Sequence, residues 1–455
     1  MTSCASHPSA ELAAFASALR YEQIPSDVLQ RCKALLLDSL GCSLAGARSR
    51  PVLSMEKFAV IMGPQDGPSE VLISRRKTSP MFAALVNAAS AHMLELDDVH
   101  NGAVLHPGTV VFPGILAMAQ ALGSSGKAFL TAAVAGYEVG IRVGEFLGRS
   151  HYKVFHTTAT AGTLAAAAAA GRLLGLNPDR MLDAFGSAGT QAAGLWEFLR
   201  DAADAKQLHS SNAVVNGMKS AYLAQDGFIG AKRILEGPQG MAAGMSTDAD
   251  PARLTDRLGT RWALAETSFK YHASCRHTHP AADALLALMR EQSLQAAQIA
   301  HILAHVHQSA LDILGPISQP TTVLQSKFCI GHVLAIAALH GRAGLREFDA
   351  SLADADVLSF RERVRMRLDA QVEASYPARW IGKVTVTTTD GRELDARVDE
   401  PKGDPGNSLT RAEIEEKFLT LATYAGAMRP DEAPALITRV WNLDDTAQIG
   451  RVLAG

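Results

Sequence analysis

The sequence predicts a mainly α protein, with one large all-helical domain and a smaller α/β domain that forms a lid. Two observations support this prediction. Helix start and stop signals follow one another through the first 260 residues, and strand-like alternation is confined to the stretch between residues 302 and 398. With 455 residues, 47% of them hydrophobic, the chain is long enough to bury more than one core.

The expected helices of the larger domain are marked by apolar periodicity and by capping residues. Four are expected, over residues 26–40, 79–97, 113–123 and 162–174. In the second, Ser79 is the expected N-cap and Pro80 takes the first helical position, where its missing N–H costs nothing. The fourth is Ala-rich and stops at Gly175, a C-cap glycine.

A change of periodicity after residue 266 predicts the lid. Residues 302–307 and 383–389 alternate between apolar and polar side chains, as strands do. Asp390-Gly391 is a hairpin turn signal that leads into a further strand over residues 394–398. Between these strands, residues 327–341 are expected to form a helix.

The domain limits follow from where helical character ends and returns. Residues 401–407 have the composition of a loop, and Thr410 then opens a capping box at the start of a new helix. The last 50 residues are therefore expected to rejoin the first domain. This assigns residues 1–266 and 401–455 to the helical domain and residues 267–400 to the lid.

Charge and composition argue against several classes of partner. The 43 Lys and Arg residues are balanced by 46 Asp and Glu, so the chain lacks the basic excess of a nucleic-acid-binding protein. It contains no apolar run of about 18 residues and no secretory signal pattern. Cys4, Cys32, Cys42, Cys275 and Cys329 are scattered without a CxxC pair, which is typical of reduced thiols. We expect a cytoplasmic protein with no nucleic-acid or membrane partner.

Titratable side chains are concentrated between residues 92 and 106. His92, Asp97, Asp98 and His106 lie within this segment, and a carboxylate beside a histidine can tune it for proton transfer near neutral pH. Two other interpretations stay open at this point. The acidic pair can cap a helix end beside surface histidines, or the segment can hold a metal, although its spacing matches no known ligand motif.

Two further polar segments flank expected helices. His156 directly precedes the Ala-rich helix, and helix N-termini attract anions. Lys206 and His209 are three residues apart, so on a helix they share one face. The plain alternatives are a structural histidine and a solvated helix edge.

The segment at the expected domain junction is rich in cations and histidines. Lys270 and Arg276 lie in it together with His279 and Cys275. Ligand sites are common at such junctions, and Lys and Arg can hold carboxylates. Zinc binding by the Cys-x-His-x-His run and a nucleophilic role for Cys275 have no specific support, and no phosphate-binding loop or nucleophile elbow is present.

Together these segments resemble the MmgE/PrpD family, which includes 2-methylcitrate dehydratase, cis-aconitate decarboxylase and iminodisuccinate epimerase. The matching segments are residues 36–42, 92–108, 155–158, 206–212, 270–280, 326–328 and 403–407. They occur in family order and span nearly the whole chain. The resemblance implies a helical domain built from both chain ends, an α/β lid, a homodimer, and no metal or organic cofactor.

The resemblance also implies roles for single residues. His156, Lys206 and Lys270 fall where cis-aconitate decarboxylases have an active-site His, Lys and Lys. Several positions depart from that pattern, among them Val99, which stands where the decarboxylases have a threonine. Glu95 stands where the decarboxylases carry an aspartate, and Cys275 stands where the animal decarboxylases have a histidine. The residues therefore leave dehydration, decarboxylation and epimerisation open.

The expected function is a cofactor-independent lyase that acts on a small di- or tricarboxylate by moving a proton at a carbon next to a carboxylate. The charge that develops there needs cations already in place. The expected catalytic residues are His106, Asp97, Asp98 and His156. The expected substrate-binding residues are Lys206, Lys270, Arg276, His209 and His279. Alternatives are an epimerase or isomerase of an iminodisuccinate-like dicarboxylate and a non-catalytic anion-binding protein of the same fold.

Overall fold

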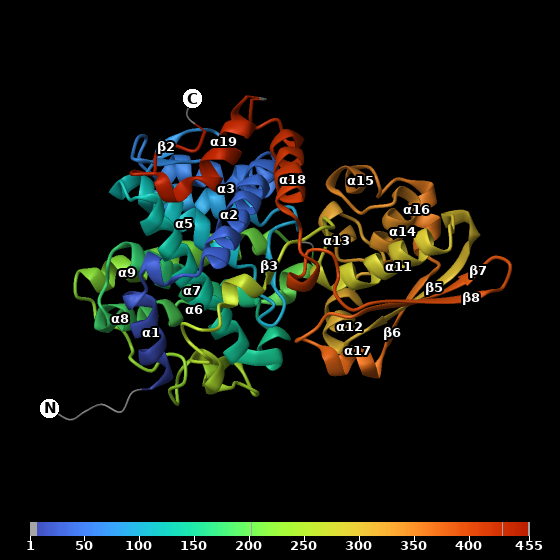
Figure 1. The fold of residues 1–455 in the computed structure, drawn as a ribbon, viewed down its shortest axis with the longest axis horizontal. Coiled ribbons are helices and arrows are strands. Elements are labelled where there is room, and N and C mark those ends of the chain that lie inside the picture. The colour runs from blue at the N-terminus through green and yellow to red at the C-terminus, as the bar shows by residue number, and fades with distance from the viewer. Residues whose placement is uncertain (1–6, 202, 430, 454–455) are drawn as a thin grey trace.

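The computed structural model describes residues 7–201, 203–429 and 431–453, and it shows a large helical body beside a smaller lid that carries a sheet (Figure 1). The mainly α fold predicted from the sequence is confirmed. The helices of the body are α1 (Pro8–Ala18), α2 (Ser26–Gly46), α3 (Arg50–Met62), α4 (Pro80–Ala91), α5 (Pro107–Leu122), α6 (Gly126–Tyr152), α7 (Thr157–Leu173), α8 (Pro178–Gly189), α9 (Ala205–Gln225), α10 (Met241–Met245), α18 (Arg411–Tyr424) and α19 (Glu432–Trp441).

Short strands join the loops of the body, and a longer sheet forms one layer of the lid. The short strands are β1 (Ser69–Glu70), β2 (Lys77–Thr78), β3 (Val99–His100) and β4 (Thr267–Ser268). The lid contains α11 (His279–Glu291), α12 (Gln308–Leu314), α13 (Val323–Ser326), α14 (Ile330–His340), α15 (Leu345–Asp349), α16 (Ala355–Arg361), α17 (Ala370–Ser375), β5 (Ile299–Val306), β6 (Val364–Leu368), β7 (Gly382–Thr388) and β8 (Glu393–Val398).

The Ala-rich helix α7 lies at the centre of the body, packed against α5, α6, α8 and α9. Small residues allow this close approach. A Cβ placed on Gly140 of α6 would lie 2.6 Å from the Cβ of Ala165, and one on Gly217 of α9 would lie 2.5 Å from that of Ala166. Because real Cβ atoms do not come so close, glycine at these two positions sets the spacing of the helices.

Several helix boundaries differ from those the sequence predicts. Helix α2 continues to Gly46 rather than ending at residue 40, and α7 starts at Thr157 rather than at residue 162. Helix α4 starts at Pro80 with Ser79 as N-cap, as predicted, but it ends at Ala91 rather than near Asp97. The chain turns away there, and Glu95 adopts a left-handed φ of 57°. Helix α5 starts at Pro107, six residues before the predicted Pro113, because Pro107 already supplies the first-turn proline.

The two ends of the chain meet on the helical body. Helices α18 and α19 both pack against α2, and Figure 1 shows these C-terminal helices beside the N-terminal ones. The capping box predicted at Thr410 is present, with Glu413 as its second member. An ion pair of 2.7 Å between Arg75 and Glu432 adds a further link between the ends.

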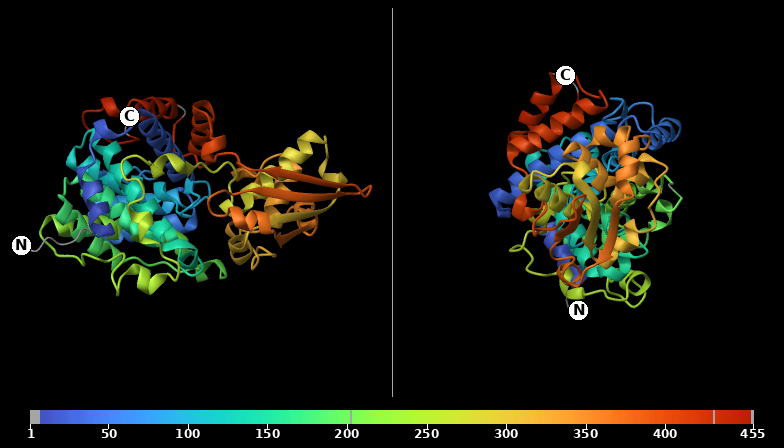
Figure 2. Two further views of the ribbon diagram at one scale, coloured as in Figure 1. Left: turned by 60° about the horizontal axis from the view of Figure 1, so that its bottom comes forward. Right: turned by 90° about the vertical axis from the view of Figure 1, so that its right-hand side faces the viewer.

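The lid is built on a four-stranded sheet in the order β6-β5-β7-β8. Strand β5 pairs parallel with β6 and antiparallel with β7, and β7 and β8 form the predicted hairpin. Helix α11 packs against β7 and β8, and Figure 2 shows the sheet projecting away from the body. The helix predicted over residues 327–341 starts only at Ile330, so Lys327 lies in the short connection after α13.

The described cysteines are all unpaired and buried, whereas Cys4 lies outside the described residues. None of the described helices combines the length and the apolar character that crossing a bilayer requires.

Candidate active site

The loop between α4 and β3 carries the densest group of titratable residues. Its position follows from a strand pairing, since Val99 and His100 of β3 pair antiparallel with Ser268 and Thr267 of β4. Lys270 lies two residues after the end of β4, so this pairing brings the loop beside the segment that leads into the lid. Residues about 170 positions apart in the chain thereby meet in one buried cluster.

Asp97 lies between two histidine rings. Nδ1 of His92 donates to Oδ2 of Asp97 at 2.8 Å, and Nδ1 of His106 lies 3.1 Å from the same oxygen. Burial by itself would raise the pKa of Asp97, but the two histidines hold it well below its usual value. Burial lowers the pKa of His92 to about 4 and also lowers that of His106. The arrangement is an ionised carboxylate that orients two neutral imidazoles.

Asp98 has a different environment from its neighbour. The hydroxyl of Tyr137 donates to Oδ2 at 2.7 Å, and the backbone N–H of Gly108 donates to Oδ1 at 3.0 Å. Burial raises the pKa of this carboxyl well above its usual value. Its backbone oxygen accepts a 2.8 Å hydrogen bond from Nδ1 of His106. Asp98 therefore contacts the cluster through its main chain.

Glu95 lies between two lysines. Its Oε2 is 3.1 Å from Nζ of Lys270, and its Oε1 makes a close contact with Nζ of Lys206 at the start of α9. All three side chains are almost fully buried. Burial would raise the pKa of Glu95, but the two ammonium groups lower it strongly. The lysines that the sequence assigns to substrate carboxylates thus already share a carboxylate of the protein.

His156 extends the histidine cluster toward α9. It is the N-cap residue of α7, and its ring stacks on that of His92 with 5.5 Å between centroids. Its Nδ1 lies 3.2 Å from Nδ1 of His209, so one ring donates and the other accepts. Burial lowers the pKa of His156 well below its usual value and that of His209 to about 4. The structure therefore brings both histidines to the cluster in neutral form.

Two protein-family models match this chain, and together they cover most of the segments that form the cluster. The model of the MmgE/PrpD N-terminal domain matches residues 10–254, and that of the MmgE/PrpD C-terminal domain matches residues 272–443. The chain belongs to the MmgE/PrpD family. The family predicted from the sequence is thereby confirmed.

Curated members of the MmgE/PrpD family align with this chain over most of their length. The cis-aconitate decarboxylase-like protein oryM of Aspergillus oryzae is 30% identical over 98% of this chain and 96% of its own. The cis-aconitate decarboxylase of Aspergillus terreus is 28% identical over 98% and 95%. The 2-methylcitrate dehydratase of Cupriavidus necator is 25% identical over 88% and 87%.

Within this MmgE/PrpD chain, Arg276 and His279 are engaged with groups outside the lysine cluster. Arg276 makes a close ion pair with Asp404, and its Nε lies 3.3 Å from Oδ1 of Asn101. Its Nη1 donates to Nδ1 of His279 at 3.3 Å, and Nε2 of His279 donates to the backbone oxygen of Ser274. None of their described hydrogen bonds is to His106, Lys206 or Lys270.

The thiol of Cys275 is buried beside the cluster. Burial raises its pKa to about 11, so at neutral pH it is a protonated thiol rather than a nucleophilic thiolate. Its backbone N–H donates to the backbone oxygen of Lys327 at 2.9 Å, which links the junction segment to the connection between α13 and α14.

Two groups of described residues have the composition of a metal site. His92, Asp97 and His106 are one of them. Nδ1 of His106 also donates to a carbonyl oxygen, which can only accept, so this nitrogen carries a proton and is not a free metal ligand. A metal bound by this group would therefore have to contact His106 through its Nε2.

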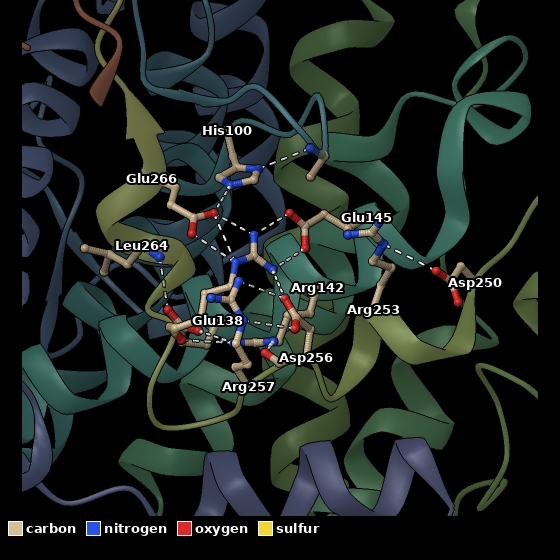
Figure 3. A network of polar contacts seen from close by, with 12 residues as sticks. His100, Glu138, Arg142, Glu145, Asp250, Arg253, Asp256, Arg257, Leu264 and Glu266 are labelled. Atoms are coloured by element: carbon tan, nitrogen blue, oxygen red, sulfur yellow. Dashed lines mark hydrogen bonds and ion pairs between the residues drawn. The ribbon is translucent and has the colours of Figure 1, made fainter. Parts of the chain in front are cut away.

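His100, Glu145 and Glu266 form the second group (Figure 3). The guanidinium of Arg261 lies between the two carboxylates, 2.6 Å from Glu145 and 2.5 Å from Glu266. The position of a metal cation is therefore taken by a side chain.

Three further residues of the cluster are not among the site residues that the sequence predicts. Trp196 packs on His156 with 4.8 Å between ring centroids, and Tyr137 reaches Asp98 from α6. The side-chain amide of Gln207 is buried next to Lys206, and neither of its polar atoms has a partner among the described residues. Only Gln207 lies within a segment that the sequence singles out. The other two are visible only once the helices are packed.

Most of the cluster is buried, with His106 only 8% exposed, whereas His209 at its edge is half-buried. Two cavities border it. One of about 510 Å³ is lined by His209 and Phe198, and one of about 430 Å³ is lined by Trp196 on the body and Gln325 on the lid. The second cavity lies where body and lid face each other.

Proposed function

We propose that this protein is a cofactor-independent lyase that acts on a small di- or tricarboxylate by proton transfer at a carbon next to a carboxylate. The observation that carries the proposal is the contact between Asp97 and two neutral histidines beside a pair of buried lysines. Relatives named for cis-aconitate and 2-methylcitrate, both tricarboxylates, support the substrate class.

In the proposed mechanism His106 is the acid–base residue. Its Nδ1 is held by Asp97 and by the backbone oxygen of Asp98, which leaves Nε2 to exchange a proton with carbon. Lys206 and Lys270 stabilise the enediolate-like charge that develops on the neighbouring carboxylate. His156 stacks close to His92 and is placed to give a proton to a departing group.

Both lyase reactions balance with these groups. In dehydration, Nε2 of His106 takes the proton from carbon, the C–O bond breaks, and the leaving hydroxide becomes water with a proton that His156 passes on from solvent, so that His156 is neutral before and after the step. In decarboxylation, the C–C bond breaks and CO2 leaves, the electron pair stays on carbon as the enediolate, and His106, which takes up a proton at Nε2 from solvent, gives that proton to the carbon. The same clamp serves both reactions because the intermediate charge is the same.

A substrate screen followed by proton NMR tests the proposal. Citrate, 2-methylcitrate, cis-aconitate and iminodisuccinate are incubated separately with the wild type and with His106→Ala. We expect conversion of at least one acid by the wild type and loss of most turnover in the variant. Exchange without product would indicate an epimerase instead. Thermal stabilisation without exchange or turnover would indicate a non-catalytic anion-binding protein.

We also propose that the protein is a homodimer. Helix α3 exposes Leu53 and Ile61, whose exposed fractions are 42% and 78%, and Leu208 at the start of α9 is 44% exposed. An ion pair of 2.7 Å between Arg50 and Asp204 holds the starts of these two helices side by side. Exposed apolar side chains of this kind suit contact with a second copy of the chain. Light scattering tests the proposal, since Ile61→Asp should shift a dimer toward monomer.

Two further proposals concern organisation and location. We propose that residues 1–266 and 401–455 form the helical domain and residues 267–400 the lid, which the packing of α18 and α19 on α2 supports. We place the protein in the cytoplasm, because the described cysteines are unpaired thiols, as is typical of a reducing compartment.

A further inference from the structure

A third buried lysine lies beside Glu95. Nζ of Lys327 donates to the backbone oxygen of Leu94 at 2.7 Å, and the side chain is only 4% exposed. Lys327 comes from the connection between α13 and α14 in the lid, whereas Leu94 belongs to the loop after α4 in the body. The lid therefore reaches the Glu95 loop through Lys327 as well as through the segment that holds Lys270.

Lys327 lacks the counter-charge that its neighbours have. Among the residues that the structure describes, no carboxylate lies within 4.0 Å of its ammonium group, whereas Lys206 and Lys270 both contact Glu95. Burial lowers the pKa of Lys327 to about 8, with Glu95 opposing that shift and Lys270 adding to it. Besides the Leu94 oxygen, the ammonium group has the ring of Phe348 at 5.5 Å from its centroid. Its two remaining N–H donors have no hydrogen-bond acceptor among the described residues, and burying them is costly unless a further acceptor arrives.

A second lysine, Lys417, anchors the loop that carries Glu95 without leaving its own charge unpaired. Nζ of Lys417 on α18 donates to the backbone oxygen of Leu96 at 2.9 Å, on the other side of Glu95. Lys417 is paired with Asp38 at 2.5 Å, so its charge is compensated within the protein. Both lysines anchor the loop, but only Lys327 keeps an unpaired charge facing the cluster.

We infer that Lys327 is a substrate-binding residue that meets one carboxylate of the polycarboxylate substrate from the lid side. This inference rests on the proposed function. Because Lys206 and Lys270 already share Glu95, an entering carboxylate gains most by pairing with the ammonium group of Lys327, which has no carboxylate partner among the described residues. A charge-assisted hydrogen bond of this kind contributes about 10- to 100-fold to affinity.

Calorimetric titration with unreactive acids tests the inference without relying on turnover. Tricarballylate carries three carboxylates, while glutarate and methylsuccinate each lack a different one of them. The wild type is compared with Lys327→Met and with Lys327→Gln, which removes the charge but keeps a donor for the Leu94 oxygen. Replacing a buried charge with an apolar side chain of similar length is usually tolerated by the fold.

We expect both Lys327 variants to bind tricarballylate about 10- to 100-fold more weakly than the wild type. If Lys327 binds one particular carboxylate, the dicarboxylate that lacks this carboxylate should be affected less. For that dicarboxylate, the ratio of wild-type to variant affinity should be at least about fivefold smaller than for tricarballylate. In turnover assays the variants should raise KM more than they lower kcat. The matched control is the double variant Asp38→Asn/Lys417→Met, which removes the other loop anchor with its counter-ion and should leave the ligand ratio unchanged.

Equal losses for all three acids in the Lys327 variants would overturn the inference, because a purely structural role affects every ligand alike. Binding with the expected coupling but without turnover of any substrate would support the inference and refute the lyase. If the wild type turned over a polycarboxylate but Lys327→Met bound tricarballylate as tightly as the wild type does, the lyase would be supported and the inference refuted. A folded wild type that binds none of these acids would refute both.

Discussion

Glu95 and Lys270 form a buried ion pair, with Oε2 and Nζ 3.1 Å apart, that joins the loop after α4 to the segment entering the lid. The pairing of β3 with β4 brings these two residues together. Lys206 contacts the other oxygen of the same carboxylate. One glutamate therefore compensates two lysines that the proposed mechanism needs for the substrate.

Replacing Glu95 with Gln should weaken the fold and strengthen the response to ligand. The variant keeps the shape of the side chain but leaves two buried ammonium groups without their carboxylate, which costs about 3–5 kcal/mol. A bound polycarboxylate can then replace the missing charge. Urea unfolding measures the loss of unfolding free energy in the variant. Thermal unfolding with and without cis-aconitate measures how far the ligand restores stability.

Stabilisation of the variant by ligand distinguishes a role of Glu95 as a counter-charge from a role in packing. We expect cis-aconitate to raise Tm more in Glu95→Gln than in the wild type. If the ligand raised Tm equally in both proteins, the carboxylate of Glu95 would not occupy a position that substrate carboxylates can take.

Asparagine variants of the adjacent Asp97 and Asp98 give a matched comparison. Asp97→Asn removes the ionised carboxylate that orients His92 and His106, so kcat should fall about 100-fold or more. Asp98→Asn leaves the backbone contact to His106 in place, so kcat should fall less than about tenfold, with a larger effect on stability. Steady-state kinetics of both variants, with unfolding midpoints as control, decides between them. Equal losses of kcat would show that the roles of the two carboxylates are not separated.

Stability should fall steeply between about pH 6.5 and pH 4. Burial lowers the pKa of His92, His151, His209 and His332 to about 4 and that of His307 to about 3. Unfolded histidine takes up its proton near pH 6.5, so below that value the unfolded state binds more protons than the folded state. Each such histidine then removes about 1.4 kcal/mol of unfolding free energy per pH unit.

Three buried acids act in the opposite direction. Burial raises the pKa of Glu138 to about 7 and also raises the pKa values of Asp38 and Asp98, so their folded forms take up a proton first and gain stability as the pH falls. The five histidines outweigh these three acids. Urea unfolding at pH 7.5, 6 and 5 measures the slope, and His332→Gln in the lid should make it shallower. A midpoint that stays constant over this range would contradict the assignment of neutral buried histidines.

Close packing of α7 and α9 predicts a pair of glycine variants. A Cβ on Gly217 would lie 2.5 Å from the Cβ of Ala166 and 2.6 Å from the backbone nitrogen of Ala167, so Gly217→Ala should cost about 1–3 kcal/mol. Gly244 of α10 has open space around it, so Gly244→Ala should be neutral or slightly stabilising. Similar unfolding midpoints for the two variants would contradict the proposed spacing of the helices.

Much of the fold could be predicted from local signals. Ser79 and Pro80 mark the start of α4, Gly175 follows the end of α7, and the Asp390-Gly391 turn marks the hairpin of β7 and β8. These features depend on backbone conformations that a few neighbouring residues determine. The family resemblance added the order of the segments and was confirmed by the family models.

The remaining features depend on contacts between distant residues. Strand β6 alternates between apolar residues and arginines, but it is only 5 residues long and the prediction missed it; its place in the sheet depends on parallel pairing with β5. The sequence assigned Lys206 and Lys270 to substrate, and it could not show that Glu95 reaches both of them. Whether Asp97 or Asp98 faces the histidines likewise depends on the turn after α4, which periodicity does not define.

Incorporation of solvent deuterium tests the central claim most directly. The wild type, His106→Asn and the control His340→Asn, at an exposed histidine, are incubated in heavy water with the polycarboxylates above and followed by proton NMR. We expect the wild type and the control to place deuterium on the carbon next to a carboxylate, in product or in recovered substrate, and His106→Asn to do so about 10²–10⁴-fold more slowly. Deuterium incorporation by His106→Asn at the wild-type rate would contradict the account.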